Sequence, residues 1–107
     1  MELFNDLALG LGNIWRLSQA KTFSISAENP TGEKGKGGMA TEGTGAGAAR
    51  DLGRGWKVSP SVQLQPQSTY TLADIAGPAA IQHIWMTCDP RFWRYLILRF
   101  YWDGEEN

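Results

Sequence analysis

Apolar side chains recur along the first twenty residues at intervals of three and four, which is typical of one face of a helix. This face contains Leu3, Phe4, Leu7, Leu11, Ile14, Trp15 and Leu17. Gly10 and Gly12 interrupt it, and a glycine inside a helix costs up to about 1 kcal/mol relative to alanine. The pattern therefore predicts a short leading helix within residues 1–20.

Apolar and polar side chains alternate in the second half of the chain. The alternation begins at Trp56 and runs to residue 65, and Pro60 assigns this segment to a sheet edge. Two richer apolar runs follow at 80–87 and 93–102, and Asp89-Pro90-Arg91 is expected to turn the chain between them. Short strands at this spacing predict that residues 56–107 belong to a sandwich or barrel.

Glycine dominates the segment between these two patterns. Nine of the chain's 13 glycines lie from Gly32 to Gly55, where large aliphatic side chains are nearly absent. A brief strand at Phe23, Ile25 and Ala27 is expected to lead into this segment. We therefore expect residues 28–55 to form a long loop, and we expect its part from Gly32 to Gly55 to be the most mobile internal region of the chain.

The composition narrows the class of protein. A length of 107 residues allows one domain, and a formal net charge of -1 gives no reason to expect nucleic acid or an anionic membrane as a partner. The single cysteine, Cys88, excludes an internal disulfide. The first residues are acidic and no apolar run reaches the ~20 residues of a membrane span, so we expect a soluble, cytoplasmic protein.

The polar loop from Ser26 to Gly38 is the strongest candidate for a binding site, because it carries two carboxylates and two ammonium groups among glycines. Paired carboxylates such as Glu28 and Glu33 are what glycoside chemistry requires, although neighbouring acids on a loop are more often solvated or paired with lysines. Aromatic side chains on the later segments suit stacking on sugar rings. The candidate substrate-binding residues are Glu28, Asn29, Glu33, Lys34, His83 and Trp85.

Several of these features also have a simpler interpretation. The aromatic faces of the last strands can serve packing or a subunit interface, and His83 can hold two strands together instead of acting as a general acid or base. Gly35-Lys36-Gly37-Gly38-Met39-Ala40 matches a dinucleotide-binding fingerprint only formally, because no βαβ pattern surrounds it. No cofactor and no metal site are expected.

Six blocks of the sequence together resemble the start of glycoside hydrolase family 172, also known as domain of unknown function 2961. They are Trp15-Arg16-Leu17-Ser18, the run from Ser24 to Gly32, Gly53-Arg54-Gly55-Trp56-Lys57, the run from Thr71 to Ile75, the run from Ile81 to Trp85, and Trp102-Asp103-Gly104-Glu105-Glu106. The resemblance covers nearly the whole chain. It implies a partial jelly-roll β-sandwich with a short helix, and a retaining enzyme for difructose anhydride or arabinofuranosides.

The resemblance also implies where catalysis would lie. The two catalytic glutamates of the family correspond to positions after Asn107, so no residue of this chain is assigned a catalytic role. We therefore expect residues 1–107 to be a truncated, amino-terminal part of a jelly-roll domain that is inactive alone. The parent is expected to bind a furanoside and to form trimer-based homo-oligomers. The alternative is a non-catalytic carbohydrate-binding or assembly β-sandwich.

Overall fold

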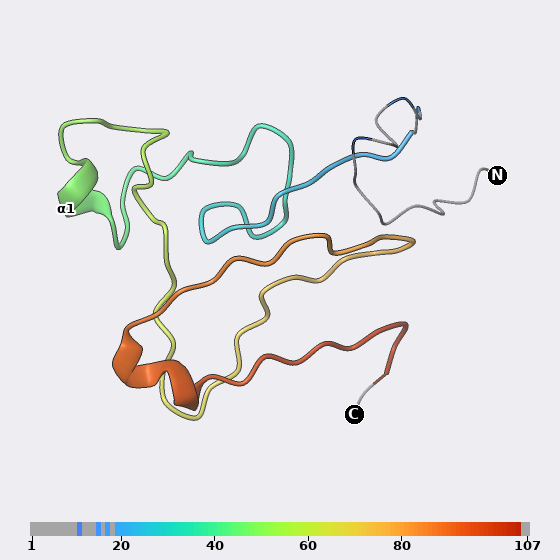
Figure 1. Cartoon of the computed structure of the whole chain (residues 1–107). Coiled ribbons are helices and arrows are strands. Elements are labelled where there is room, and N and C mark those ends of the chain that lie inside the picture. Colours follow the sequence, from blue (N-terminus) through green and yellow to red (C-terminus); the bar gives the residue numbers. More distant parts are fainter. Residues whose placement is uncertain (1–10, 12–14, 16, 18, 106–107) are drawn as a thin grey trace.

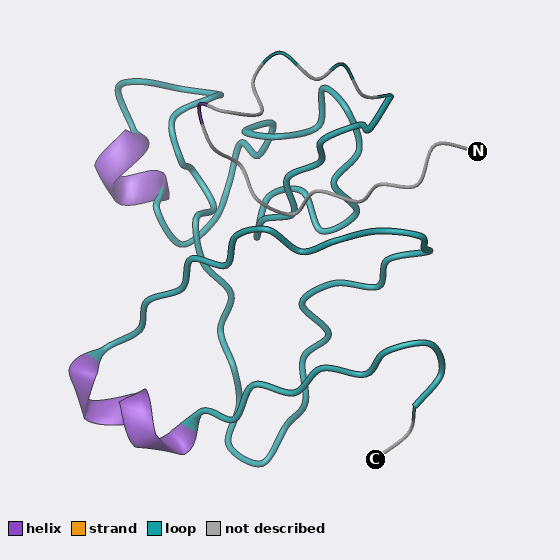
Figure 2. Cartoon of the chain, turned by 45° about the vertical axis from the view of Figure 1, so that its right-hand side comes forward, coloured by secondary structure: helices purple, strands orange, loops and turns teal. Residues whose placement is uncertain are grey.

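The computed structural model describes residue 11, residue 15, residue 17 and residues 19–105, so the helix predicted within residues 1–20 lies largely outside the described residues. The described residues contain two helical elements, α1 (Ala46–Ala49) and the 3-10 helix η2 (Pro90–Tyr95). Figures 1 and 2 show the loops of the first half gathered at one end of the molecule. The later residues form long, open loops away from that end.

The prediction of a mainly β jelly roll or β-sandwich is wrong for the part of the chain that the structure describes. That part contains no strand, and its only β-bridge is an isolated antiparallel pair between Ser26 and Asn29. The expected strand at Phe23, Ile25 and Ala27 is accordingly not formed. Within the described residues, the layers of a sandwich are therefore absent.

The physical reason is that alternation specifies an extended segment but not its partner. A strand exists only where backbone N–H and C=O groups of two segments form a ladder of hydrogen bonds. Among the described residues, no backbone-to-backbone hydrogen bond involves residues 69–88, and the large apolar side chains of residues 81–102 remain exposed. The extended course that the pattern predicts is thus present without the pairing.

The turn expected at Asp89-Pro90-Arg91 is longer than predicted, because it continues as η2 to Tyr95. Asp89 is the N-cap, and its Oδ1 accepts a hydrogen bond from the backbone N–H of Arg91 at 2.9 Å. Proline at the first helical position has a pre-set φ and lacks only an N–H that would have no helical partner. The last apolar segment consequently becomes extended at Leu96 rather than at Trp93.

The buried part of the molecule is small and lies beside α1. Ala49 and Val58 are the buried apolar residues of the described chain, and Asn29 is its buried polar residue. The N–H of Gly45 donates to the carbonyl of Val58 at 2.8 Å, which fixes α1 on the segment that follows the glycine-rich loop. The glycine-rich loop, although poor in large side chains, supplies Ala49, one of the two buried apolar residues.

Candidate functional site

The polar loop, defined as residues 26–38, is built from consecutive turns. Ser26 and Asn29 exchange two backbone hydrogen bonds, of 3.1 and 3.0 Å, and the carbonyl of Asn29 also accepts from the N–H of Gly32 at 3.2 Å. Gly32 has a φ of 67°, a conformation in which glycine is strongly favoured. A further turn joins Lys36 N–H to the carbonyl of Glu33 at 3.1 Å.

Asn29 organises this loop from its interior. Its side chain is only 6% exposed, and Nδ2 donates to the carbonyl of Glu33 at 3.0 Å. A buried amide needs such a partner, because an unpaired buried polar group costs about 1–3 kcal/mol. The bond draws Glu33 towards the start of the loop and leaves the side chains of Glu33 and Lys34 exposed.

Glu28 connects the polar loop to a distant segment. Its Oε1 accepts a hydrogen bond from the backbone N–H of Ser59 at 2.6 Å, across 31 positions of the sequence. Its Oε2 is buried and has no hydrogen-bond partner among the described residues. The carboxylate is therefore directed into the molecule.

One further contact joins the glycine-rich loop to the same distant segment, and another closes the glycine-rich loop on itself. The hydroxyl groups of Thr44 and Ser61 lie 2.7 Å apart, and the N–H of Gly55 donates to the carbonyl of Gly38 at 2.8 Å. Together with the Glu28 bond, these contacts hold the polar loop, α1 and residues 58–61 against one another. We call this assembly the loop junction.

The predicted site residues divide into two sets. Glu28, Asn29, Glu33 and Lys34 lie on the polar loop, whereas His83 and Trp85 lie on an extended segment that no hydrogen bond of the described chain joins to the loop. Trp85 is 72% exposed and His83 is also exposed. Ser59 was missed in the sequence, because no local pattern marks a backbone donor for a carboxylate 31 residues away.

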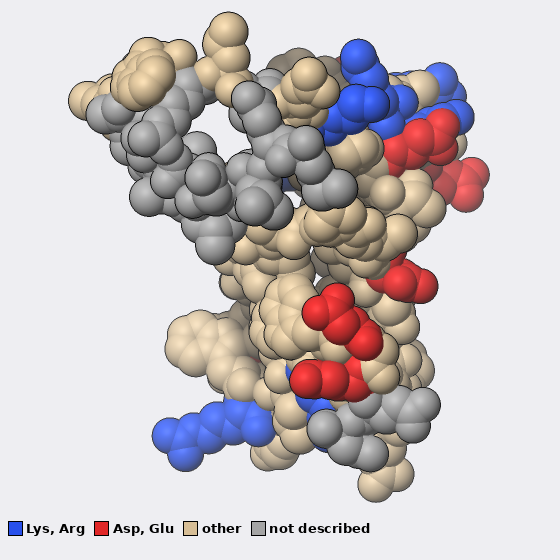
Figure 3. All heavy atoms as spheres, turned by 90° about the vertical axis from the view of Figure 1, so that its right-hand side faces the viewer, with Lys and Arg blue, Asp and Glu red and all other residues tan. Residues whose placement is uncertain are grey.

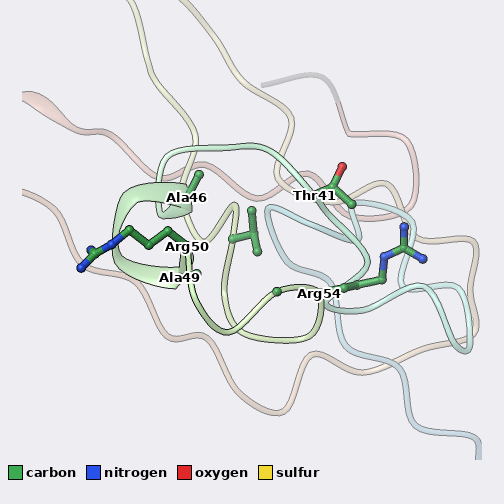
Figure 4. A pocket seen from close by; sticks show the side chains of 7 residues that line it. Thr41, Ala46, Ala49, Arg50 and Arg54 are labelled. Carbon is green, nitrogen blue, oxygen red and sulfur yellow. The ribbon is translucent and has the colours of Figure 1, made fainter.

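A hollow of about 140 Å³ lies beside α1. It is lined by Thr41, Ala46, Ala49, Arg50, Gly53, Arg54 and Val58. Figure 4 shows the guanidinium groups of Arg50 and Arg54 directed outwards, so the hollow is lined mainly by small and aliphatic groups. The Arg50 guanidinium also has a hydrogen-bond partner nearby, because its Nη1 donates to the carbonyl of Gly47 at 3.0 Å.

Charges of both signs are mixed on the face drawn in Figure 3, where basic side chains gather at one upper corner with acidic side chains directly below them. Among the described residues, no group of three or more His, Cys, Asp or Glu side chains is placed to hold a metal ion. Within the same residues, no helix is long and apolar enough to cross a membrane.

Among the ion pairs of the described residues, the shorter one lies far along the chain, at η2. Arg91 Nη2 contacts Asp89 Oδ2 at 2.7 Å, and Arg91 Nε lies 3.0 Å from Oδ1. The side-chain bond from Arg91, followed by its backbone bond, lowers the pKa of Asp89, and the same carboxylate raises the pKa of Arg91. This pair caps η2 and has no contact with the polar loop.

Comparison with known proteins does not assign the site. No model of a known protein family and no curated protein sequence matches the chain.

Proposed function

We propose that this chain supplies part of the sugar-binding surface of a furanoside-processing glycoside hydrolase, as its resemblance to glycoside hydrolase family 172 implies. The observation that carries the proposal is the construction of the polar loop. Its inward-facing residues, Glu28 and Asn29, are held by hydrogen bonds, whereas Glu33 and Lys34 are exposed at its tip. A carboxylate and an ammonium group provide an acceptor and donors for sugar hydroxyls.

The exposed aromatic residues give a second reason for choosing a carbohydrate. Sugar rings present C–H faces that stack on aromatic side chains, and Trp85 has most of its surface free. His83 and Trp85 would form this stacking surface, separately from the polar loop. We assign hydrolysis to residues of the parent enzyme outside those described. We place this enzyme in the cytoplasm.

Sugar binding can be tested by following the NMR spectrum of the chain during titration with methyl arabinofuranoside and with difructose anhydride. We expect shifts in the polar loop that are weakened by Lys34→Ala and Glu33→Gln. Lys21→Ala is the matched control, because Lys21 is an exposed lysine outside the loop. Sugar binding that is unchanged in Lys34→Ala and Glu33→Gln, or no binding of either sugar, would overturn the proposal.

A second candidate, a non-catalytic role in assembly, is favoured by the number of exposed apolar side chains in residues 81–102. Aryl furanoside assays on the chain and its parent separate the two. Turnover by the parent supports the hydrolase, and a parent that is oligomeric but neither binds nor cleaves furanosides supports assembly. The chain alone is expected to show no turnover under either proposal.

A further inference from the structure

We propose that Glu28 is a positioning residue rather than a sugar ligand, and that its carboxylate is the strap that keeps the polar loop closed on residues 58–61. This role is separate from the proposed function, because it concerns the conformation of the loop whether or not the loop binds sugar. The juxtaposition that carries it is the bond from Ser59 N–H to Glu28 Oε1, at 2.6 Å.

The first argument is that the protein itself engages one carboxylate oxygen of Glu28 and encloses the other. Oε1 is occupied by the Ser59 N–H, and Oε2 is enclosed by the protein without a partner in the described residues. A sugar hydroxyl would have to displace the chain to reach Oε2, and it would share Oε1 with the Ser59 N–H. The exposed side chains of Glu33 and Lys34 have no such obstacle.

The second argument is the place of this bond in the loop junction. The other polar contacts of the junction join the glycine-rich loop to residues 58–61, or the end of the polar loop to Gly55. The Glu28 bond alone, among the hydrogen bonds of the described residues, connects the polar loop to residues 58–61. Hydrogen bonds to a charged acceptor are also about twice as strong as neutral ones.

The third argument is that the bond closes a large segment of chain. The residues between Glu28 and Ser59 include most of the glycines, which lose more conformational freedom on ordering than other residues. Without the strap, the turns at Gly32 and Lys36 would be attached to the junction only through Gly38. We therefore expect the polar loop to open as a unit when the strap is removed.

The test is hydrogen exchange of the full chain, read at the Gly32 and Lys36 amides. Glu28→Ala removes the acceptor, and Ser59→Pro removes the N–H without touching Glu28. Each variant is expected to accelerate both amides by about tenfold or more. The double variant should be no faster than the faster single one, because both changes remove the same bond.

Two controls distinguish release of the strap from general unfolding. Ser59→Ala retains the N–H and should leave exchange in the loop within about twofold of that in the unsubstituted chain. The amide of Phe92, which donates to the carbonyl of Asp89 at 2.9 Å, reports on η2 and should not change in any variant. Unaltered Gly32 and Lys36 exchange in both Glu28→Ala and Ser59→Pro, or equal acceleration at Phe92, would overturn the proposal.

Discussion

Gly43 lies so close to Ser59 that no β-carbon fits between them. A methyl group built on Gly43 would overlap the side-chain atoms and the Cα of Ser59, and Gly43 also has a φ of 153°, which side chains rarely adopt. The glycine-rich loop thus has a specific packing role here, because its bare backbone allows residues 58–61 to approach. Ser59 also takes part in the Glu28 bond, because it provides the N–H that Glu28 accepts.

The first prediction follows from this contact. Gly43→Ala should destabilise the loop junction by about 1–3 kcal/mol, the usual cost of overpacking a close contact. The measurement is hydrogen exchange at the Gly45 amide, which donates to Val58 in this junction. Gly47→Ala is the matched control, because nothing lies within 4 Å of the added methyl group and alanine favours the helix α1. Equal protection of Gly45 in both variants would refute the packing role of Gly43.

The second prediction concerns the interior of the polar loop. Asn29→Ala removes one donor to the Glu33 carbonyl, which keeps its bond from the Lys36 N–H, so the change should cost the net value of one hydrogen bond, about 0.5–1.5 kcal/mol. Cleavage by a lysine-specific protease at Lys34 and Lys36 should therefore become faster. Thr31→Ala changes an exposed residue of the same loop and should leave the cleavage rate unaltered. Slow cleavage of both variants would show that Asn29 does not hold the loop.

Some of these features could be predicted from the sequence and others could not. Asp89 followed by Pro90 is a helix-start signal as well as turn chemistry, so the beginning of η2 was present in the sequence but was interpreted as a turn. The alanines of α1 are strong helix formers, but the surrounding glycines favour the prediction of a long loop over residues 28–55. In both cases the local signal was available.

The bond between Glu28 and Ser59, by contrast, could not be predicted from the sequence. The charged residues of the polar loop can be seen in the sequence, but its carboxylates look equivalent there. Only the arrangement in space shows that Glu28 faces inwards while Glu33 is exposed. The missing strands have a related cause, because alternation describes the faces of one segment and pairing depends on another segment.

The third prediction is a pH dependence at η2. Because Arg91 lowers the pKa of Asp89, the capped form is favoured above the ordinary pKa of an aspartate and is lost as the pH falls through the lowered pKa. An NMR titration of the Asp89 carboxyl should show this lowered value. Arg91→Ala removes the side-chain bonds but retains the backbone N–H, so the pKa should rise towards its ordinary value without reaching it. An unchanged titration in Arg91→Ala would contradict this assignment.

The last prediction concerns the exposed apolar surface. The accessible surface of the chain is 10552 Å², whereas a compact monomer of 11.8 kDa exposes about 5,900 Å². The radius of gyration is 17.1 Å, compared with about 13 Å for a compact domain of this length. Tyr95 and Ile97 are 78% and 75% exposed, and the other large apolar residues of 81–102 are between 41% and 72% exposed. Apolar surface of this extent favours association.

We therefore expect the purified chain to associate reversibly as its concentration rises, and to bind a dye that fluoresces on apolar surfaces. Ile97→Lys should weaken association, because burying the new ammonium group would carry a desolvation cost and lysine on an extended edge opposes pairing. Ala48→Lys adds the same charge to the exposed side of α1 and should leave association unchanged. Sedimentation velocity measures the effect directly. A monomer at all concentrations, or equal weakening by the two lysines, would show that residues 81–102 do not drive association.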